Sequence, residues 1–181
     1  MAIYQDIMSS EYVEIARQFH VNSEHCDNPE HYERYINQDC FTDHNQGMGV
    51  THVFIDENEK TGQKIIAGYI TLRMSSLIMD SGEGFKLGYP ALEIAELAVD
   101  ENYEGQRIGT DMVMTAINEA VEMNRGKIGV QYVILCADTA AVEFYSRKEL
   151  GFRKIRYMQE IPREHRNSTC EPMMLKIVKN M

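Results

Sequence analysis

Two carboxylates interrupt an apolar stretch near the middle of the chain. Glu93 and Glu96 lie in the run ALEIAELAV, residues 91–99, where burying a charge is costly unless it is paired or functional. If this run is a strand, alternation places the two side chains on opposite faces of it. Either carboxylate could act as a general base, and either could instead point into solvent near the start of the strand. The sequence leaves both alternatives open.

A glycine-bearing turn follows this run. The stretch NYEGQRIGTDMV, residues 102–113, leads from the apolar run into residues with helical spacing. A strand that enters a helix through a short turn leaves the first N–H groups of the helix unpaired, and together with the helix dipole they can bind a phosphate. Gly105 and Gly109 allow a close backbone approach. The pattern is neither G-x-G-x-x-G nor the Walker signature, so by itself it fits a ligand loop and an ordinary turn equally well.

The second half of the chain alternates between strand and helix patterns. From Arg107 onward, apolar residues recur three and four positions apart, which predicts an amphipathic helix ending near Gly126. The run VQYVILCA at 130–137 is typical of a buried strand. The elements expected here are a strand at 91–100, a helix from 107 to about 126, a strand at 130–137, a helix at 138–150 with Asp138 or Thr139 as N-cap, and strands at 152–159 and 171–178.

The first half is less regular. Residues 51–56 and 64–74 have strand patterns separated by a polar turn, so they predict a β-hairpin. Residues 29–41 have helical spacing, whereas residues 12–21 fit a strand or a helix. The segment 75–90, which contains several glycines and a proline, is expected to be a long loop.

Length and composition fit one globular domain. The chain has 181 residues, of which 44% are hydrophobic, enough to build a sizeable core. The β-α-β-α-β-β order of the second half predicts an α/β fold, with a mixed central β-sheet flanked by helices. We therefore expect a single domain spanning residues 1–181.

The net charge of −10 argues against a generic nucleic-acid-binding protein, whose phosphate contacts need clustered Lys and Arg. Residues 147–166 nevertheless carry more Lys and Arg than Glu. This segment fits a solvated surface, or a patch for an anionic substrate or cofactor.

The cysteines and histidines do not form a recognisable site. Among the four cysteines there is no CxxC pair, and Cys136, within an apolar run, is expected to be a small core residue of a reduced, cytoplasmic protein. The six histidines lack paired ligand spacing, so we expect no metal. We also expect no membrane span, because no apolar run approaches about 20 residues, and no signal peptide.

Two motifs together resemble the GNAT superfamily of acetyl-CoA-dependent N-acetyltransferases. The stretch LAVDENYEGQRIGTDMV is similar to the family's cofactor motif, and ADTAAVEFYSRKELGF at 137–152 is similar to a second family motif with a Phe-Tyr pair and a Gly-Phe pair. The resemblance implies the GNAT fold, with core cofactor-binding motifs at 91–152. It also implies that acetyl-CoA (coenzyme A) is the cofactor.

The resemblance assigns cofactor contacts to two segments. Backbone groups of Leu97, Ala98 and Val99 would bind the acetyl-pantetheine arm, and the following loop would wrap the pyrophosphate. The loop residues are Glu104, Gly105, Gln106, Arg107, Ile108, Gly109 and Thr110. Glu104 stands where the family usually has Gln or Arg, and Arg107 where it often has Gly. We expect Glu104 to face away from the pyrophosphate and Arg107 to lie near it or near the adenosine 3′-phosphate.

Acetyl transfer to an amine needs a base for the amine proton, a donor for the developing oxyanion and an acid for the leaving thiolate. The resemblance implies that Tyr145 is the acid and that the Val99 N–H is the oxyanion donor. The phenol of a tyrosine, with a pKa near 10, is suited to give its proton to a thiolate of similar basicity. Tyr145 could instead be a core aromatic residue. Glu93 matches the glutamate of the histone-acetyltransferase branch, Glu96 is the second candidate base, and a water chain is the third possibility.

The acceptor is left open by the sequence. We expect a primary amine of a small molecule, peptide or protein, and Asp80 and Glu83 in the 75–90 segment would suit a cationic amine. The sequence from the hairpin to the central strand, IIAGYITLRMSSLI (65–78) and YPALEIAELAVD (89–100), also resembles toxin-type acetyltransferases that modify the amino group of aminoacyl-tRNA, although the net charge fits that activity poorly. A non-catalytic acyl-CoA-binding protein is a third possibility, and a homodimer is possible by analogy.

Overall fold

The computed structural model describes residues 3–80, 82, 84–155 and 170–177. The chain forms two compact units. The first contains Met1–Arg73 and Ala95–Met112, and the second contains Met74–Ile94 and Val113–Met181. Two long strands, β3 (Lys64–Asp80) and β4 (Lys86–Val99), have residues in both units.

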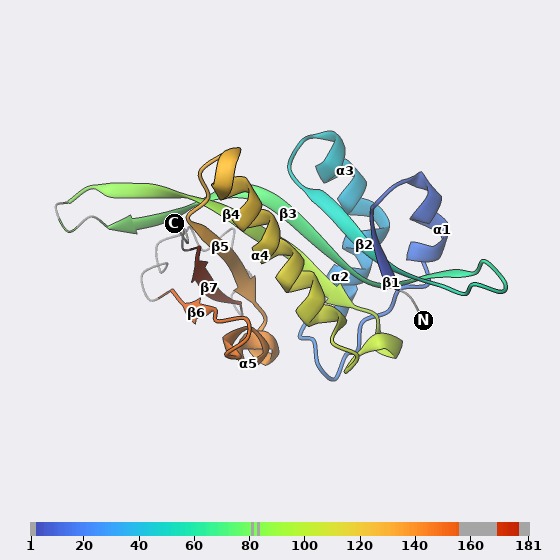
Figure 1. Ribbon diagram of the computed structural model, residues 1–181. Helices are drawn as coiled ribbons and strands as arrows, with labels where there is room; N and C mark the ends of the chain where they lie inside the picture. The colour runs from blue at the N-terminus through green and yellow to red at the C-terminus, as the bar shows by residue number, and fades with distance from the viewer. Residues whose placement is uncertain (1–2, 81, 83, 156–169, 178–181) are drawn as a thin grey trace. The chain divides into compact units, whose positions relative to one another are not determined.

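The strands among the described residues form a sheet with the hydrogen-bonded order β1-β2-β3-β4-β5-β7-β6 (Figure 1). The remaining strands are β1 (Ile3–Ile7), β2 (Val50–Glu57), β5 (Tyr132–Ala137), β6 (Arg153–Lys154) and β7 (Glu171–Lys176). β4 pairs with β5 in parallel, whereas β1–β2, β2–β3, β5–β7 and β6–β7 are antiparallel. The predicted α/β fold with a mixed sheet is confirmed.

In the first unit, β1 pairs with β2 from Ile3↔Asp56 to Ile7↔His52. β2 also pairs with β3, with a register shift between Phe54 and Ile55. The predicted hairpin is therefore confirmed, whereas β1 was not predicted because its half-exposed sequence IYQDI has no strong apolar pattern.

The helices of the first unit come from the N-terminal third of the chain. The ambiguous segment 12–21 begins helical, with a 3₁₀ turn η1 (Ser10–Tyr12) followed by α1 (Val13–Ala16). The helix predicted at 29–41 is confirmed as a continuous run of α2 (Pro29–Arg34), a π-helical turn η2 (Tyr35–Asp39) and α3 (Cys40–Asn45). Buried side chains from these helices, from the segments beside them and from β2, β3 and β4 form one core: Met8, Tyr12, Ala16, Phe19, Tyr35, Ile36, Cys40, Val53, Ile55, Ile66, Tyr69 and Ala98.

In the second unit, the first part of β4 pairs with β5 from Ala91↔Tyr132 to Ile94↔Leu135. β5 then pairs with β7, and β7 with β6. A smaller core here consists of Leu77, Ala91, Tyr132, Ile134 and Ile155. Of the strand predicted at 152–159, β6 covers two residues, and 156–159 lie outside the described residues.

Two helical regions complete the fold. α4 (Ile108–Gly126) matches the predicted amphipathic helix, and its buried positions recur at helical spacing: Ile108, Met112, Val113, Ala116 and Ala120. The helix predicted at 138–150 is shorter, with a 3₁₀ turn η4 (Thr139–Ala141) and α5 (Val142–Ser146). It ends because Arg147 adopts an extended ψ of 146°.

The structure corrects the long loop predicted at 75–90. β3 continues to Asp80 and β4 already begins at Lys86, so most of this segment is a hairpin. Its side chains alternate, with Leu77 buried between exposed Ser76 and Ile78, which is the strand period that the polar and glycine residues obscured. Glu83, a candidate for acceptor binding, lies outside the described residues.

The structure also corrects the prediction for Cys136. This side chain is exposed near the end of β5 and forms a disulfide with Cys170, so it is neither a core residue nor a reduced thiol. The pairing of Cys136 with Pro172 explains the bond, because Cys170 lies just before Pro172 and the Cα atoms of the two cysteines are 5.4 Å apart.

Candidate active site

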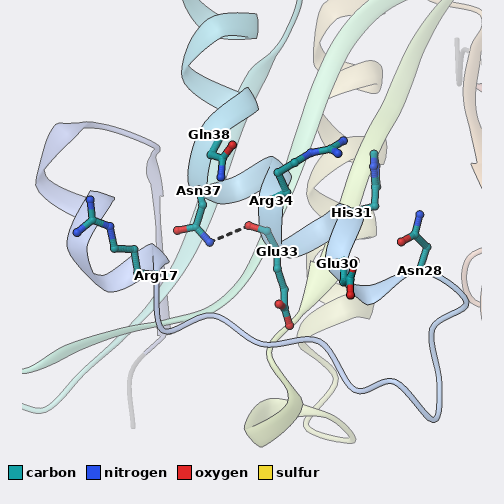
Figure 2. Close-up of a pocket in the computed structure, with 8 residues that line it drawn as sticks. All are labelled: Arg17, Asn28, Glu30, His31, Glu33, Arg34, Asn37 and Gln38. Atoms are coloured by element: carbon teal, nitrogen blue, oxygen red, sulfur yellow. Dashed lines mark hydrogen bonds between the residues drawn. The ribbon is translucent and has the colours of Figure 1, made fainter.

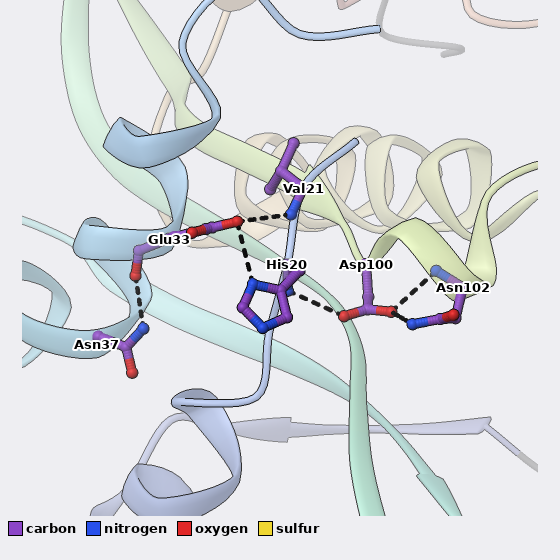
Figure 3. Close-up of polar contacts among 6 residues, drawn as sticks. All are labelled: His20, Val21, Glu33, Asn37, Asp100 and Asn102. Carbon is purple, nitrogen blue, oxygen red and sulfur yellow. Dashed lines mark hydrogen bonds and ion pairs between the residues drawn. The ribbon is translucent and has the colours of Figure 1, made fainter. Parts of the chain in front are cut away.

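A buried aspartate anchors the turn between β4 and α4. Asp100 is 2% exposed, and its carboxylate accepts hydrogen bonds from the backbone N–H and side-chain amide of Asn102, each at 3.0 Å. It also accepts from the His20 N–H at 3.1 Å, as Figure 3 shows. The Glu101 N–H donates in turn to the His20 carbonyl at 2.8 Å. The extended segment at His20 therefore fixes where β4 ends.

Tyr103 provides a second anchor, in the 3₁₀ turn η3 (Glu101–Tyr103). Its buried ring carries a hydroxyl that donates to Asp56 Oδ2 of β2 at 2.8 Å. Burial, with this hydrogen bond to a carboxylate, raises the pKa of Tyr103 to about 12. Tyr103 thus stays protonated at neutral pH and ties the turn to the sheet.

The loop itself has an unusual backbone. Gly105 has φ 75°, and Arg107 has φ 68°, which makes it the sole non-glycine residue with positive φ in the described part of the chain. The Asp111 N–H donates to the Arg107 carbonyl at 3.0 Å, so the helix begins directly after Arg107. The left-handed conformation at Arg107 explains why the family pattern often has glycine at this position.

The start of α4 is suited to an anion. By helix geometry, the N–H groups of Ile108, Gly109 and Thr110 precede the first N–H that bonds within the helix, and the helix dipole places partial positive charge there. A left-handed residue next to right-handed ones also turns successive N–H groups to one side. The backbone from Gly105 to Thr110 therefore fits a pyrophosphate group.

Gly68 of β3 holds this helix close to the sheet. A Cβ atom at Gly68 would lie 3.0 Å from the Met112 Cε and 3.1 Å from the Ala98 carbonyl oxygen. The first turns of α4 and the end of β4 thus meet at a position with no room for a side chain. This contact fixes the helix start relative to residues 97–99.

The backbone of β4 has two edges near its end. The Asp100 N–H donates to the Ala67 carbonyl of β3 at 3.0 Å, and the Ala98 carbonyl also faces β3, at Gly68. Because strand residues alternate, the polar backbone groups of Leu97 and Val99 point to the edge away from β3. Those N–H and carbonyl groups could hydrogen-bond an acyl arm that lies along this edge. The contacts assigned to Leu97, Ala98 and Val99 stay predictions.

Glu104 has defined partners. Its Oε2 lies 2.8 Å from His25 Nδ1 and accepts from Asn22 Nδ2 at 3.2 Å, and the side chain is 30% exposed. Both partners belong to the segment that follows His20. The carboxylate is therefore held by the N-terminal part of the first unit, and its orientation relative to a bound pyrophosphate stays a prediction.

The structure separates the two candidate bases. Glu96 lies in the first unit, and its Oε2 is 3.0 Å from the Nε2 of His31 in α2, with the two side chains 18% and 33% exposed. Glu93 lies in the second unit, half-buried, where β4 pairs with β5 at Ile134. The contact of His31 with Glu96 was not predictable from local pattern, because 65 positions separate the two residues and His31 lies in a polar helix.

Tyr145 lies in the second unit, on α5. It is 6% exposed and packs edge-to-face against Phe144 and Phe152, with ring centroids 4.9 and 5.8 Å away. The Phe152 N–H donates to the Tyr145 carbonyl at 3.2 Å. This packing fixes the ring, and its role as an acid stays a prediction.

Neither a metal-binding cluster nor a membrane-spanning helix is found among the described residues. No group of three or more His, Cys, Asp or Glu side chains has a metal-binding arrangement there. No helix in the same residues is long and apolar enough to cross a membrane. Of the basic segment at 147–166, residues 156–166 lie outside the described part.

A protein family model matches most of the chain. The family described as "Acetyltransferase (GNAT) family" matches residues 8–152, which include the turn, both candidate bases and Tyr145. A comparison with curated protein sequences finds no match.

Solved structures of bacterial toxins have a similar fold. A tyrosine-to-phenylalanine mutant of the toxin AtaT, bound to the C-terminus of the antitoxin AtaR and acetyl-CoA, has a TM-score of 0.69 at 16% identity, covering 96% of this chain and 92% of that one. A tyrosine-to-phenylalanine mutant of KacT has a TM-score of 0.72 at 14% identity, covering 97% and 95%. AtaT complexed with acetyl-methionyl-tRNAfMet has a TM-score of 0.69 at 18% identity, covering 90% and 96%.

Proposed function

Because the chain belongs to the acetyltransferase (GNAT) family, we propose that it transfers the acetyl group of acetyl-CoA to a primary amine of a small molecule, peptide or protein. The observation that carries this proposal is the turn between β4 and α4. It joins a left-handed backbone at Gly105 and Arg107 to the start of α4, where the first N–H groups of a helix have no partner within the helix. Enzymes of this family take acetyl-CoA as co-substrate, and a turn of this kind would bind the pyrophosphate of that molecule.

The turn supports the following contacts with acetyl-CoA. The N–H groups of Ile108, Gly109 and Thr110 would bind the pyrophosphate, with the guanidinium of Arg107 adding positive charge nearby. Leu97 and Val99 would bind the acyl arm through the backbone edge away from β3, and the Val99 N–H would donate to the thioester oxygen. Acetyl-CoA supplies the activated acyl group, and the chain supplies the donors that orient it.

For the leaving thiolate we propose Tyr145 as the proton donor. Its ring is fixed by two phenylalanines, which supports a defined hydroxyl position, and an acid of this kind typically contributes 10²- to 10⁴-fold in rate. Tyr145→Phe should lower acetyl transfer by about 100-fold or more and leave acetyl-CoA affinity within about twofold. Tyr89→Phe, a second tyrosine of the same unit, is the matched control and should transfer normally.

The decisive experiment is an acceptor screen. Thiol release from acetyl-CoA is followed with polyamines, amino acids, peptides and aminoacyl-tRNA, and the acetylated product is identified by mass spectrometry. The protein should bind acetyl-CoA and acetylate at least one amine. Binding of acetyl-CoA without transfer to any of these acceptors would instead favour a non-catalytic acyl-CoA-binding protein.

A second candidate activity is acetylation of the amino group of aminoacyl-tRNA. It is favoured by the structural likeness to AtaT, which has been solved with acetyl-methionyl-tRNAfMet. The net charge of −10 opposes it, since a tRNA partner carries many phosphates. Inhibition of cell-free translation that requires acetyl-CoA would favour this candidate, and normal translation at high protein concentration would oppose it. We propose the cytoplasm as the place of either reaction, and because the Cys136–Cys170 disulfide is formed in the structure, the assays should be run both with and without a reductant.

A further inference from the structure

Glu104 is the residue of the turn between β4 and α4 that suits an anion least, because a carboxylate repels the phosphates of acetyl-CoA. We propose that Glu104 positions this turn for acetyl-CoA without binding it, and that Asn22 and His25 hold Glu104 in place. These three side chains form a clamp on the turn. The inference rests on the proposed function, because it concerns the same cofactor site.

The first argument is the pair of contacts at the carboxylate. Glu104 Oε2 lies 2.8 Å from His25 Nδ1, and Asn22 Nδ2 donates to the same oxygen at 3.2 Å. Because an ionised carboxylate can only accept, the imidazole carries a proton on Nδ1. The two partners stand 79 and 82 positions before Glu104, so their bonds tie the turn to a distant segment of the first unit.

The second argument is that Asn22 and His25 are held together by a local turn. The His25 N–H donates to the Asn22 carbonyl at 3.2 Å, and the Glu24 N–H donates to Asn22 Oδ1 at 3.0 Å. The Asn22 amide nitrogen and the His25 Nδ1 are then 3.4 Å apart. This turn therefore presents both donors to Glu104 at once.

The third argument is that α2 holds the same segment, residues 20–25, from another side. Glu33 Oε1 accepts from the Val21 N–H at 3.0 Å and lies 3.3 Å from His20 Nδ1, as Figure 3 shows. Glu33 lines a cavity of about 660 Å³, where the Asn37 side-chain amide donates to its backbone carbonyl at 2.8 Å (Figure 2). Because the segment is fixed to α2, a bond from it can hold the cofactor turn.

The fourth argument is the place of the clamp within the turn. Asp100 and Tyr103 anchor the first part of the turn, and α4 begins at Ile108. Glu104 lies between these fixed points, directly before Gly105 with its φ of 75°. If the Glu104 side chain were released, the backbone at Gly105 could rotate, and the N–H groups that follow would lose their common direction.

The clamp and simple charge repulsion predict effects of opposite sign. If the charge of Glu104 only repels acetyl-CoA, Glu104→Ala should tighten binding, because it removes a negative charge near the phosphates. If Glu104 positions the turn, Glu104→Ala should weaken binding in spite of the lost charge. We expect the dissociation constant for acetyl-CoA to rise by about fivefold, since the carboxylate is partly exposed and its bonds are worth less than buried ones.

The test is calorimetric titration of the full chain with acetyl-CoA. Glu104→Gln keeps an acceptor oxygen for the two donors and removes the charge, so it should bind within about twofold of the wild type or more tightly. Glu101→Ala is the matched control, because its exposed side chain on the same turn has no hydrogen bond or ion pair with the described residues. It should also bind within about twofold or more tightly. With the best acceptor from the screen and saturating acetyl-CoA, Glu104→Ala should keep kcat within about twofold, because the clamp acts on binding.

His25 is tested through its coupling to Glu104. His25→Ala should raise the dissociation constant by about threefold, and His25→Asn, whose amide nitrogen can replace Nδ1 as donor, should recover most of the affinity. Added to Glu104→Ala, His25→Ala should have little further effect, because the two side chains act as one unit. By linkage, acetyl-CoA should slow amide hydrogen exchange in residues 20–25 of the wild type, and much less so in Glu104→Ala.

Three results would overturn this inference and leave the proposed function standing: unchanged or tighter binding in Glu104→Ala, an equal loss in Glu101→Ala, or additive effects of His25→Ala and Glu104→Ala. If Glu104→Ala does not fold, the comparison of His25→Ala with His25→Asn decides in its place, and equal affinities in these two variants would overturn the clamp. If the wild-type protein does not bind acetyl-CoA in the same titration, the proposed function itself fails, which is a different outcome.

Discussion

The backbone at Gly105 gives the sharpest test of the anion-binding turn. Gly105 has φ 75°, and no atom among the described residues lies within 4 Å of the place where a Cβ would stand. Gly105→Ala would therefore act through backbone conformation and not through a clash. A left-handed conformation costs a non-glycine residue about 1–2 kcal/mol. Reduced freedom of the unfolded chain offsets about 0.4–1 kcal/mol of that cost.

The net effect on stability should be modest. We expect the free energy of unfolding to fall by about 1 kcal/mol, which corresponds to about 2–4 °C in melting temperature for a chain of this size. The effect on acetyl-CoA should be larger. If the backbone relaxes away from the left-handed region, at least one N–H group leaves the phosphate, and such a charge-assisted bond contributes about 1.5–3 kcal/mol. The dissociation constant for acetyl-CoA should therefore rise by about tenfold or more.

Gly62 provides a matched control in the same unit. It has φ 68° in the turn between β2 and β3, with nothing within 4 Å of its would-be Cβ among the described residues. Gly62→Ala should lower the melting temperature by a similar amount and leave acetyl-CoA affinity unchanged. Thermal melting without ligand and calorimetric titration with acetyl-CoA measure both effects. Equal affinities in the two variants would refute the assignment of this turn to the pyrophosphate.

Three further outcomes are expected. Tyr103→Phe removes the hydrogen bond to Asp56 and should lower the free energy of unfolding by about 1 kcal/mol in urea titration. Cys136→Ser removes a disulfide that closes a separation of 34 residues, so it should cost about 3–4 kcal/mol by loop entropy, and dithiothreitol should have the same effect on the wild type. The hydrogen bond from Tyr12 lowers the pKa of Asp6 below its ordinary value of 3.8, so this bond stabilises the fold above about pH 4 and is lost as the pH falls through the lower folded value. Asp6→Asn should therefore reduce the loss of stability between pH 5 and 2 in urea titrations.

The elements that the sequence predicted well are those with strong periodicity. The helix α4 buries every third or fourth residue, and the hairpin of β2 and β3 alternates around a polar turn, so both were predictable from local pattern alone. The far end of the β3–β4 hairpin was missed because glycine, serine and proline dominate its composition. There, pairing between two strands decides the structure and single-strand propensity does not.

The site was predictable where it depends on backbone and not where it depends on distant side chains. The turn after β4 could be located because a strand, two glycines and a helix follow one another in the chain. The pair of Glu96 with His31 could not, since it depends on how α2 packs on β4. The same holds for the disulfide, which depends on the register of β5 with β7.

Arg107 shows why such a turn can keep an unfavourable residue. Its left-handed backbone costs about 1–2 kcal/mol, and an isolated turn would relax. Here both flanks are fixed. On one side, Asp100 and Tyr103 bind the turn to the His20 segment and to β2, and on the other side Met112 of α4 packs against Gly68. Because these contacts hold both flanks of the turn, the left-handed backbone can persist at Arg107, where glycine would give the same backbone without a charged side chain.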